Sequence, residues 1–152
     1  MHLRIDERAS TSATQRRRRV VLLDDDPNQL RIHSRIAQRL APSVSLIGFS
    51  DPEAAVTSVL ENAPGLVITD FNMPSLDGVA VCELLRASAA PVALVSGELN
   101  IELRLAAKAA GAAACFPKPF DIIEILAFFG VLGPRSEPLG VSLSFHREVG
   151  AH

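Results

Sequence analysis

The chain alternates five times between a short apolar segment and a segment that carries the signals of a helix. The first apolar segment, residues 20–23, is apolar at every position, which is typical of a strand buried on both faces of a sheet. The other apolar segments are residues 44–49, 66–68, 92–95 and 114–116. Because strands and helices alternate, right-handed crossovers should join the strands into a parallel sheet with helices on both faces.

Aspartate and proline mark where the predicted helices begin. Asp26-Pro27 and Asp51-Pro52 each put an N-cap aspartate before a proline at the first helical position. The apolar faces of these two helices are expected at Ile32, Ile36 and Leu40, and at Val56, Val59 and Leu60. Later helices are expected over about residues 79–86, over 101–110 and from 121. The sequence therefore predicts a flavodoxin-like α/β fold, a doubly wound five-stranded parallel sheet with five helices.

The chain has enough residues for one domain with modest ends. Its 152 residues are 48% hydrophobic, and we assign the folded domain to residues 19–130. Residues 1–18 are interpreted as a flexible basic leader, because they are polar and lack an apolar period. Residues 131–152 are interpreted as a C-terminal tail, and no output domain is expected there because Pro and Gly interrupt this short segment.

Composition excludes several classes of protein. Two cysteines are too few for a disulfide scaffold, and the charged N-terminus does not resemble a secretory signal. With no long apolar run and a net charge of −2, the sequence predicts a cytoplasmic protein without membrane contact, and nucleic acid is not an expected partner. The basic run Arg16–Arg19 is interpreted as a solvated flank. The four histidines are scattered, and none is assigned to a metal or to catalysis.

Polar side chains follow four of the five predicted strands at their carboxyl ends. They are Asp24, Asp25 and Asp26 after the first strand, Asp70 after the third, Ser96 after the fourth and Lys118 after the fifth. In an open parallel sheet these ends lie at one edge, where ligands bind. Asp26 is best explained as a helix cap, because Pro27 follows it. Lys118 is one of only two lysines in the chain, so a general supply of surface lysine does not explain its position.

Carboxylates that converge at one sheet edge need a positive charge beside them. At about 4 Å each pair repels by several kcal/mol in a protein-like dielectric, which is a large share of a domain's stability. Mg²⁺ suits the predicted site, because it takes one or two carboxylates together with phosphate oxygens. With Lys118 supplying the remaining charge, such a site can receive a phosphoryl group on an aspartate.

Four segments, in this order, resemble the receiver domains of two-component response regulators. They are VLLDDDP at residues 21–27, VITDFNMPSLDG at 67–78, VALVSG at 92–97 and FPKPF at 116–120. The resemblance spans about residues 20–129. It implies the receiver fold, Mg²⁺ as the cofactor and phosphorylation of one aspartate.

The resemblance also implies a role for each acidic residue. Asp70 is implied as the phospho-acceptor and Asp25 as the direct Mg²⁺ ligand, with Asp24 acting mainly through bound water. The backbone carbonyl of Asn72 is implied as a further metal ligand.

Two further positions match the residues that bind the phosphoryl group in this family. Ser96 matches the switch hydroxyl, and Lys118 matches the lysine that pairs with the phosphate. A cis bond between Lys118 and Pro119 is implied as well, a geometry essentially reserved for bonds that precede proline.

The chain departs from the family pattern at two places. The family usually has an aromatic residue three positions before the lysine, where this chain has Cys115. Phe116 is adjacent, but one step along a strand puts a side chain on the opposite face. In this family the aromatic side chain turns inward when the switch hydroxyl moves, and we expect this coupling to be altered here. Residues 78–91, which should hold the third helix and its connection, are also short for the family.

The resemblance implies a signalling protein that is not a turnover enzyme. A single-domain response regulator, similar to the chemotaxis receivers, would take a phosphoryl group on Asp70 from a sensor histidine kinase or a phosphotransfer protein. It would then signal to a separate target protein by conformational switching. One alternative is a phosphohydrolase of the haloacid dehalogenase type, although the order of the acidic motifs argues against it. The other alternative is a receiver-like scaffold that works by binding alone.

The last helix is apolar over more of its surface than one sheet contact needs. Its apolar residues are Ile122, Ile123, Ile125, Leu126, Phe128 and Phe129. We therefore expect an output surface on residues 101–110 and 121–129 and on the strand between them, where a charge at Phe129 should disturb a partner. A homodimer, a target protein or a strand-like part of the tail at Val141, Leu143 and Phe145 could cover this surface.

Overall fold

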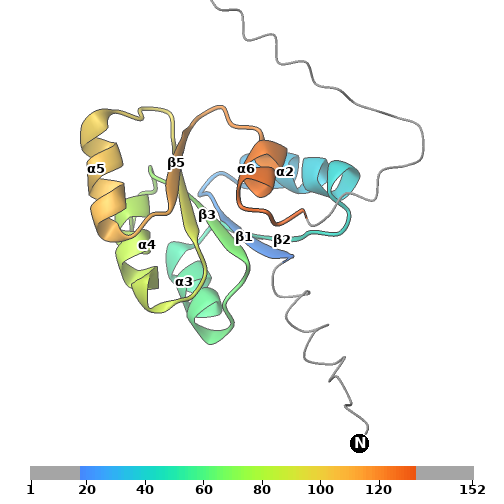
Figure 1. The fold of residues 1–152 in the computed structure, drawn as a ribbon, viewed down its shortest axis with the longest axis horizontal. Coiled ribbons are helices and arrows are strands. Elements are labelled where there is room, and N and C mark those ends of the chain that lie inside the picture. The colour runs from blue at the N-terminus through green and yellow to red at the C-terminus, as the bar shows by residue number, and fades with distance from the viewer. Residues whose placement is uncertain (1–17, 133–152) are drawn as a thin grey trace, which may run out of the picture.

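The computed structural model describes residues 18–132, which form the expected alternation of strands and helices (Figure 1). The strands are β1 (Arg19–Leu23), β2 (Ser45–Phe49), β3 (Leu66–Asp70), β4 (Val92–Ser96) and β5 (Ala114–Pro117). The helices are α2 (Pro27–Leu40), α3 (Pro52–Glu61), α4 (Gly78–Leu84), α5 (Ile101–Ala110) and α6 (Ile122–Phe128), with a 3₁₀ turn, η1 (Leu85–Ala87), after α4.

All five strands belong to one parallel sheet. Their order across the sheet is β2-β1-β3-β4-β5. The chain runs outward from β1 to β2 and then returns past β1 to β3, so the winding direction reverses between β1 and β3. This reversal opens a crevice at the carboxyl ends of β1 and β3, which is the usual ligand position in doubly wound folds. The fold class predicted from the sequence is confirmed.

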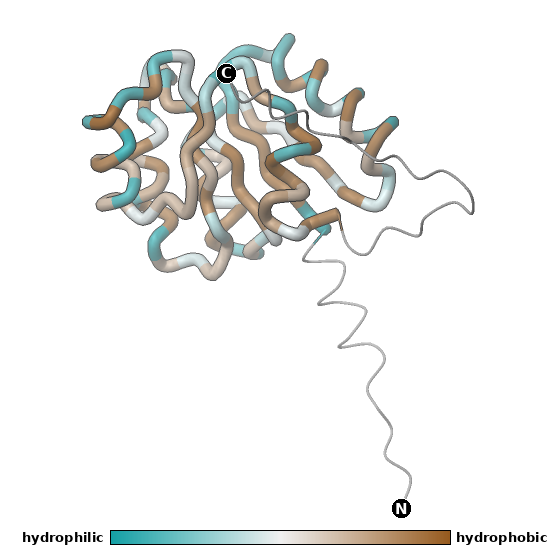
Figure 2. Tube along the Cα trace, turned by 45° about the horizontal axis from the view of Figure 1, so that its top comes forward, coloured by the Kyte–Doolittle hydropathy of each residue, from teal (hydrophilic) through white to brown (hydrophobic). Residues whose placement is uncertain are grey.

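Helices cover both faces of the sheet (Figure 1). The α3–α5 core, between the sheet and α3, α4 and α5, includes Val21 and Leu23 of β1. The α2/α6 core on the other face includes Val20 and Leu22. Neighbouring residues of β1 thus alternate between two cores, which explains why the whole segment is apolar. Figure 2 shows the resulting apolar centre along the strands.

The helix starts follow the predicted capping signals. The Asp26 carboxylate accepts the N–H of Asn28 at 2.9 Å, and the Asp51 carboxylate accepts the N–H of Glu53 at 3.2 Å. Helix α5 has the predicted bounds, and it ends at Gly111, whose φ of 106° favours glycine. The role of Asp26 as a helix cap is confirmed.

The predicted apolar faces of α2 and α3 are partly wrong. Ile32 and Leu40 of α2 are 49% and 69% exposed, and Leu60 of α3 is 50% exposed. The buried residues of α2 are instead His33 and Ala37, because α2 contacts both β2 and α6 and turns the face with these two residues toward them. The third predicted helix also divides, since α4 ends at Leu84 and continues as η1.

Several expectations lie outside the described residues. They concern residues 1–17 of the leader, which include Arg16 and Arg17. They also concern the tail from residue 133, which includes Val141, Leu143 and Phe145. Within residues 18–132, Arg19 has a structural role, because its guanidinium donates to the carbonyls of Asn62 at 2.8 Å and Ala63 at 3.2 Å beyond α3. No helix in this range has the length and apolar character needed to cross a membrane.

Candidate functional site

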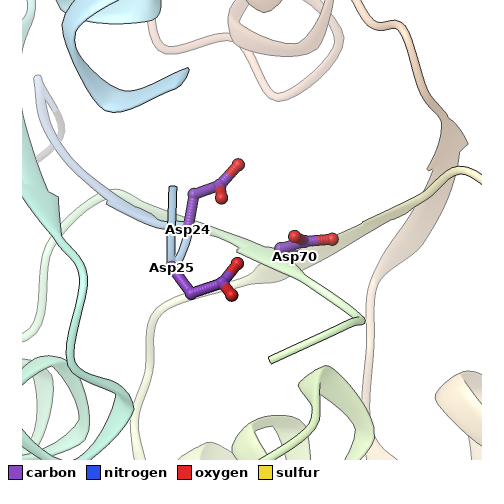
Figure 3. Close-up of side chains that lie close together, drawn as sticks. All are labelled: Asp24, Asp25 and Asp70. Atoms are coloured by element: carbon purple, nitrogen blue, oxygen red, sulfur yellow. The ribbon is translucent and has the colours of Figure 1, made fainter. Parts of the chain in front are cut away.

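The predicted site residues meet at the carboxyl edge of the sheet. Asp24 follows β1, Asp70 ends β3, Ser96 ends β4 and Lys118 follows β5. Because β1, β3, β4 and β5 are consecutive neighbours, residues distant in sequence come to one place. Figure 3 shows Asp24, Asp25 and Asp70 side by side at this edge.

Asp24, Asp25 and Asp70 form an acidic cluster. One carboxylate oxygen of each residue lies within 4.8 Å of the corresponding oxygens of the other two. Asp24 and Asp70 are 2% and 5% exposed, whereas Asp25 is exposed to solvent. Hard carboxylate oxygens at this spacing fit a small divalent cation such as Mg²⁺, because it can keep its own water on the open side at Asp25.

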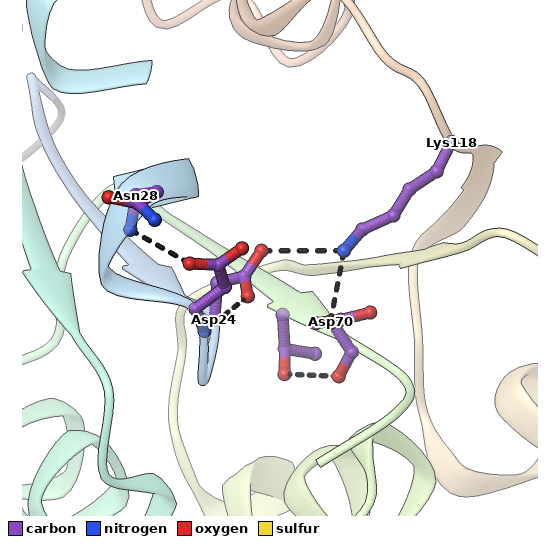
Figure 4. Close-up of polar contacts among 6 residues, drawn as sticks. Asp24, Asn28, Asp70 and Lys118 are labelled. Atoms are coloured by element: carbon purple, nitrogen blue, oxygen red, sulfur yellow. Dashed lines mark hydrogen bonds and ion pairs between the residues drawn. The ribbon is translucent and has the colours of Figure 1, made fainter. Parts of the chain in front are cut away.

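Lys118 is the cation that faces the acidic cluster in the described structure. Its Nζ lies 3.0 Å from Asp70 Oδ2 and 3.3 Å from Asp24 Oδ2 (Figure 4). The backbone N–H of Lys118 donates to the Ser96 carbonyl at 2.8 Å, which ties the end of β5 to the end of β4. The Lys118–Pro119 peptide bond is cis, as the resemblance implied.

Burial and charge shift the pKa values of Asp70 and Lys118. Burial raises the pKa of Asp70 above its usual range, although Lys118 and a backbone hydrogen bond from Asn72 oppose this shift. Burial by itself lowers the pKa of Lys118, but the hydrogen bond and charge of Asp70, together with Asp24, raise it overall. Lys118 is therefore fully charged at neutral pH, whereas burial makes the deprotonated form of Asp70 less favourable in free energy than it is in water.

Local turns fix the acidic side chains. Asp24 Oδ1 accepts the N–H of Asp26 at 2.9 Å, so the turn into α2 orients the Asp24 carboxylate. The loop after Asp70 folds back on it, because the Gly78 N–H donates to the Phe71 carbonyl at 2.9 Å. A Cβ at Gly78 would lie 2.6 Å from the Asp70 carbonyl oxygen, so only glycine fits there without a shift. Asp77 caps α4 through the Ala80 N–H at 2.9 Å.

Ser96 and Asn72 are not members of the acidic cluster, although a backbone hydrogen bond from Asn72 reaches Asp70. Ser96 is fully buried, and its Oγ accepts the N–H of Glu98 at 3.2 Å. Asn72 is exposed two residues after Asp70. Neither residue lines the pocket around Asp24, Asp70 and Lys118, so their predicted roles in binding the phosphoryl group and the metal stay predictions.

The position of Cys115 agrees with the reasoning from strand alternation. Cys115 is half-buried against the α3–α5 core, whereas Phe116 packs against the α2/α6 core on the opposite face. Burial raises the pKa of the Cys115 thiol, and Arg104 partly opposes this shift. Phe116 does not replace the aromatic residue that the family has at position 115, because the side chains of Cys115 and Phe116 lie on opposite faces of the sheet.

The site lies in a pocket of about 480 Å³. Its lining residues are Asp24, Asp25, Asp26, Gln29, His33, Asp70, Lys118, Pro119 and Phe120. Gln29 and His33 of α2, its N-cap Asp26, and the loop residues after Lys118 extend the pocket beyond the acidic cluster. The pocket therefore has an acidic end at the strand tips and a wall formed by α2 and residues 119–120.

His33, like Gln29, lines the pocket although the sequence did not assign it to the site. Its side chain is buried, and its ring stacks on Phe120 with centroids 4.4 Å apart and planes at 13°. Burial lowers the pKa of His33, with Asp24 and Asp121 raising it and Lys118 lowering it by smaller effects. The spacing of His33 and Ala37, one turn apart, was the signal that could have placed His33 on the buried face.

Comparison with known proteins agrees with the geometry. The family model described as the response regulator receiver domain matches residues 20–129. The response regulator MprA of Mycobacterium sp. (strain KMS) is 33% identical over 110 residues, which are 68% of this chain and 48% of MprA. This chain thus spans about half the length of the curated relatives it matches.

Solved receiver structures share the fold. The signal receiver domain of NarL from Mycobacterium tuberculosis matches with a TM-score of 0.65 and 29% identity, over 77% of this chain and 97% of that one. The chemotaxis protein CheY4 of Vibrio cholerae matches with a TM-score of 0.66 and 21% identity, over 75% of this chain and 97% of CheY4, and at that identity it shows the fold alone. Together with the match over residues 20–129, these likenesses show that the chain belongs to the response regulator receiver domain family.

Proposed function

We propose that this chain takes a phosphoryl group on Asp70 and relays a signal to a separate protein. The observation that supports this most strongly is the meeting of Asp24, Asp25 and Asp70 with the Lys118 ammonium at the switch point of the sheet. The donor would be a sensor histidine kinase or a phosphotransfer protein in the cytoplasm. Receiver domains are signalling proteins and not turnover enzymes, so Asp70 would be phosphorylated and later dephosphorylated without release of another product.

The reaction is a transfer from a phosphohistidine to the Asp70 carboxylate. An Asp70 oxygen attacks phosphorus, an O–P bond forms, and the P–N bond of the donor breaks with its electron pair and a proton going to the imidazole. Lys118 is 3.0 Å from Asp70, which suits it to bind a phosphoryl oxygen. The Ser96 hydroxyl, which accepts from Glu98, keeps its own hydrogen for a second phosphoryl oxygen.

The acidic cluster suits a magnesium ion as the cofactor. Asp25 and Asp70, the Asn72 backbone carbonyl and, through water, Asp24 would hold Mg²⁺. When bound, Mg²⁺ neutralises the charge of the carboxylates and of the phosphoryl oxygens. Of the carboxylates, Asp25 is the exposed one, which leaves an approach to the cluster from solvent.

The output surface is proposed on α5, β5 and α6. Ile101 and Leu105 of α5 are 74% and 64% exposed, and Phe128 of α6 is 65% exposed. The Phe128 ring packs edge-on against Phe116 of β5 and against Phe129, with centroids 5.4 and 5.0 Å away. A target protein or a second copy of the chain would cover this apolar surface.

Labelling with a small phosphodonor tests the proposal. We expect phosphoramidate to label the wild-type chain in the presence of Mg²⁺ and not in EDTA, and we expect Asp70→Asn to stay unlabelled because an amide cannot attack phosphorus. Asp77→Asn is the matched control, since Asp77 caps α4 and an asparagine also caps helices.

Three results would count against this function. Equal labelling of Asp70→Asn would remove Asp70 as the acceptor. A wild-type chain that binds no Mg²⁺ and takes no label, while folded, would favour a scaffold that works by binding alone. Sustained release of phosphate from a phosphomonoester would favour the haloacid dehalogenase type of chemistry.

A further inference from the structure

His33 occupies a place in the pocket that the proposed chemistry leaves unexplained. It is a polar residue on the buried face of α2, and 7% of it is exposed. Its Nδ1 is buried, and no hydrogen bond reaches this atom within the described residues. The ring is therefore held by packing, and its main partner is the ring of Phe120, parallel to it at 4.4 Å.

Phe120 belongs to the segment that carries Lys118. The segment leaves β5, passes through the cis Lys118–Pro119 bond, and reaches α6, where Ile122 is buried. Besides its backbone hydrogen bond to Ser96, Lys118 is held by the carboxylates of Asp70 and Asp24. These carboxylates are also the proposed metal ligands, so a cation would compete with Lys118 for them. The contact between His33 and Phe120 uses no carboxylate, and it is unaffected by that competition.

We propose that His33 is a positioning residue, which stacks on Phe120 and thereby holds Lys118 over the acidic cluster. The stack joins α2, which begins beside Asp24 and Asp25, to the loop that begins with Lys118. It thus fixes the distance between the two sides of the pocket. The consequence for phosphoryl transfer rests on the proposed function, whereas the consequence for the position of Lys118 does not.

The test uses two substitutions of His33 and one control. His33→Ala removes the ring, and His33→Phe keeps an aromatic ring without the buried nitrogen that lacks a partner. Val59→Ala is the control, because Val59 is buried in the α3–α5 core on the opposite face of the sheet, away from the pocket. Each variant is first checked for folding by circular dichroism, and the comparison is made where all are folded.

The first measurement is the NMR signal of the Lys118 side chain in the metal-free protein. Lys108, the other lysine, is exposed on α5 and gives an internal reference in the same spectrum. We expect the Lys118 Cε signals in His33→Ala to move toward those of Lys108, and His33→Phe to keep the wild-type position. Unmoved Lys118 signals in His33→Ala would overturn the proposal, whether or not the protein can be phosphorylated.

The second measurement is the initial rate of labelling by phosphoramidate at saturating Mg²⁺. We expect His33→Ala to label about three- to ten-fold more slowly, because a rate change of this size corresponds to the interaction energy of one aromatic pair. We expect His33→Phe to recover the wild-type rate. Mg²⁺ affinity should not fall, because His33 is not among the proposed ligands and a displaced Lys118 competes less for their carboxylates.

Three results would overturn the role of the stack in phosphoryl transfer. They are an unchanged rate in His33→Ala, a failure of His33→Phe to recover the rate, and an equal loss in Val59→Ala, which would indicate general destabilisation. If the wild-type chain takes no label, the proposed function fails, and the Lys118 signals alone decide the positioning role.

Discussion

At the residue scale, the acidic cluster is shaped by unequal burial of like charges. Asp24 and Asp70 are almost fully buried, and Asp25 is exposed. Two buried carboxylates repel each other strongly, and Lys118 can pair with both but supplies only one positive charge. The site therefore keeps an excess of negative charge in the absence of a cation, which opposes folding and favours metal binding.

This excess charge leads to a prediction about pH and stability. Because burial raises the pKa of Asp70 in the folded protein, the neutral carboxyl group stabilises the fold relative to the charged one. This stabilisation is complete below the usual pKa of 3.8 and is lost as the pH rises through the raised pKa of the folded state. We therefore expect Asp70→Asn to be more stable than the wild type in EDTA at neutral pH, and this difference to vanish below about pH 3.8. Urea denaturation followed by circular dichroism at several pH values measures it.

A control variant and the addition of Mg²⁺ complete this measurement. Asp51→Asn, at the exposed cap of α3, should change little at any pH, since Asn and Asp cap helices about equally. Saturating Mg²⁺ should stabilise the wild type more than Asp70→Asn, because binding to the folded state adds stability. A wild type that stays more stable than Asp70→Asn in EDTA at neutral pH would contradict the sign of the effect.

At the element scale, the loop from β3 to α4 determines where Asp70 lies. It returns so closely that a Cβ at Gly78 would lie 2.6 Å from the Asp70 carbonyl oxygen and 2.9 Å from the Phe71 Cα. Both of these are backbone atoms, which cannot rotate away as a flexible side chain could. The start of α4 thus packs directly on the backbone of the proposed phospho-acceptor.

We expect Gly78→Ala to destabilise the domain by about 1–3 kcal/mol, because the loop must shift to relieve the overlap. The shift should also weaken Mg²⁺ binding, since it moves Asp70. Gly97→Ala is the matched control, because a Cβ at Gly97 meets nothing within 4 Å. Thermal denaturation and a Mg²⁺ titration of both variants measure the two effects. Equal stability of Gly78→Ala and Gly97→Ala would show that the loop yields freely.

At the scale of the whole molecule, the site and the exposed apolar residues lie on different elements. Phosphorylation would act at the carboxyl ends of the strands, whereas Ile101, Leu105 and Phe128 lie exposed on α5 and α6. Strand β5 connects the two regions, because it ends beside Lys118 and carries Phe116, which contacts Phe128. A change at Lys118 can therefore reach the proposed output surface through one short element.

Phe128→Asp should disrupt a partner at this surface while leaving labelling of Asp70 unchanged. Covering an exposed Phe side chain is worth about 1.5–3 kcal/mol, so a self-association constant should weaken about ten-fold or more. Light scattering with and without phosphoramidate measures it, and Leu60→Asp on the exposed side of α3 is the control. Self-association of Phe128→Asp equal to that of the wild type would place the surface elsewhere. A wild type that stays monomeric in both states would exclude a second copy as the occupant.

The packing favours Phe128 over Phe129 for this substitution. The sequence made Phe129 the expected position, but Phe129 is half-buried against the α2/α6 core, and Phe128 is the more exposed ring. Similarly, the period of Ile32, Ile36 and Leu40 predicted a helix correctly but placed its buried face one residue away from His33 and Ala37. An apolar period fixes that a helix has a face, whereas the neighbouring elements decide which face is covered.

The sequence by itself determined the elements, their order and the fold class, because these follow from local signals. Apolar runs predicted the strands, and the pairs Asp26-Pro27 and Asp51-Pro52 predicted where two helices begin. The ends of the predicted strands indicated where Asp24, Asp70 and Lys118 lie. Only the tertiary structure decided which side chains touch. The stack of His33 on Phe120 joins α2 to the loop before α6, and no local pattern encodes such a contact, since it depends on how two distant elements pack across the pocket.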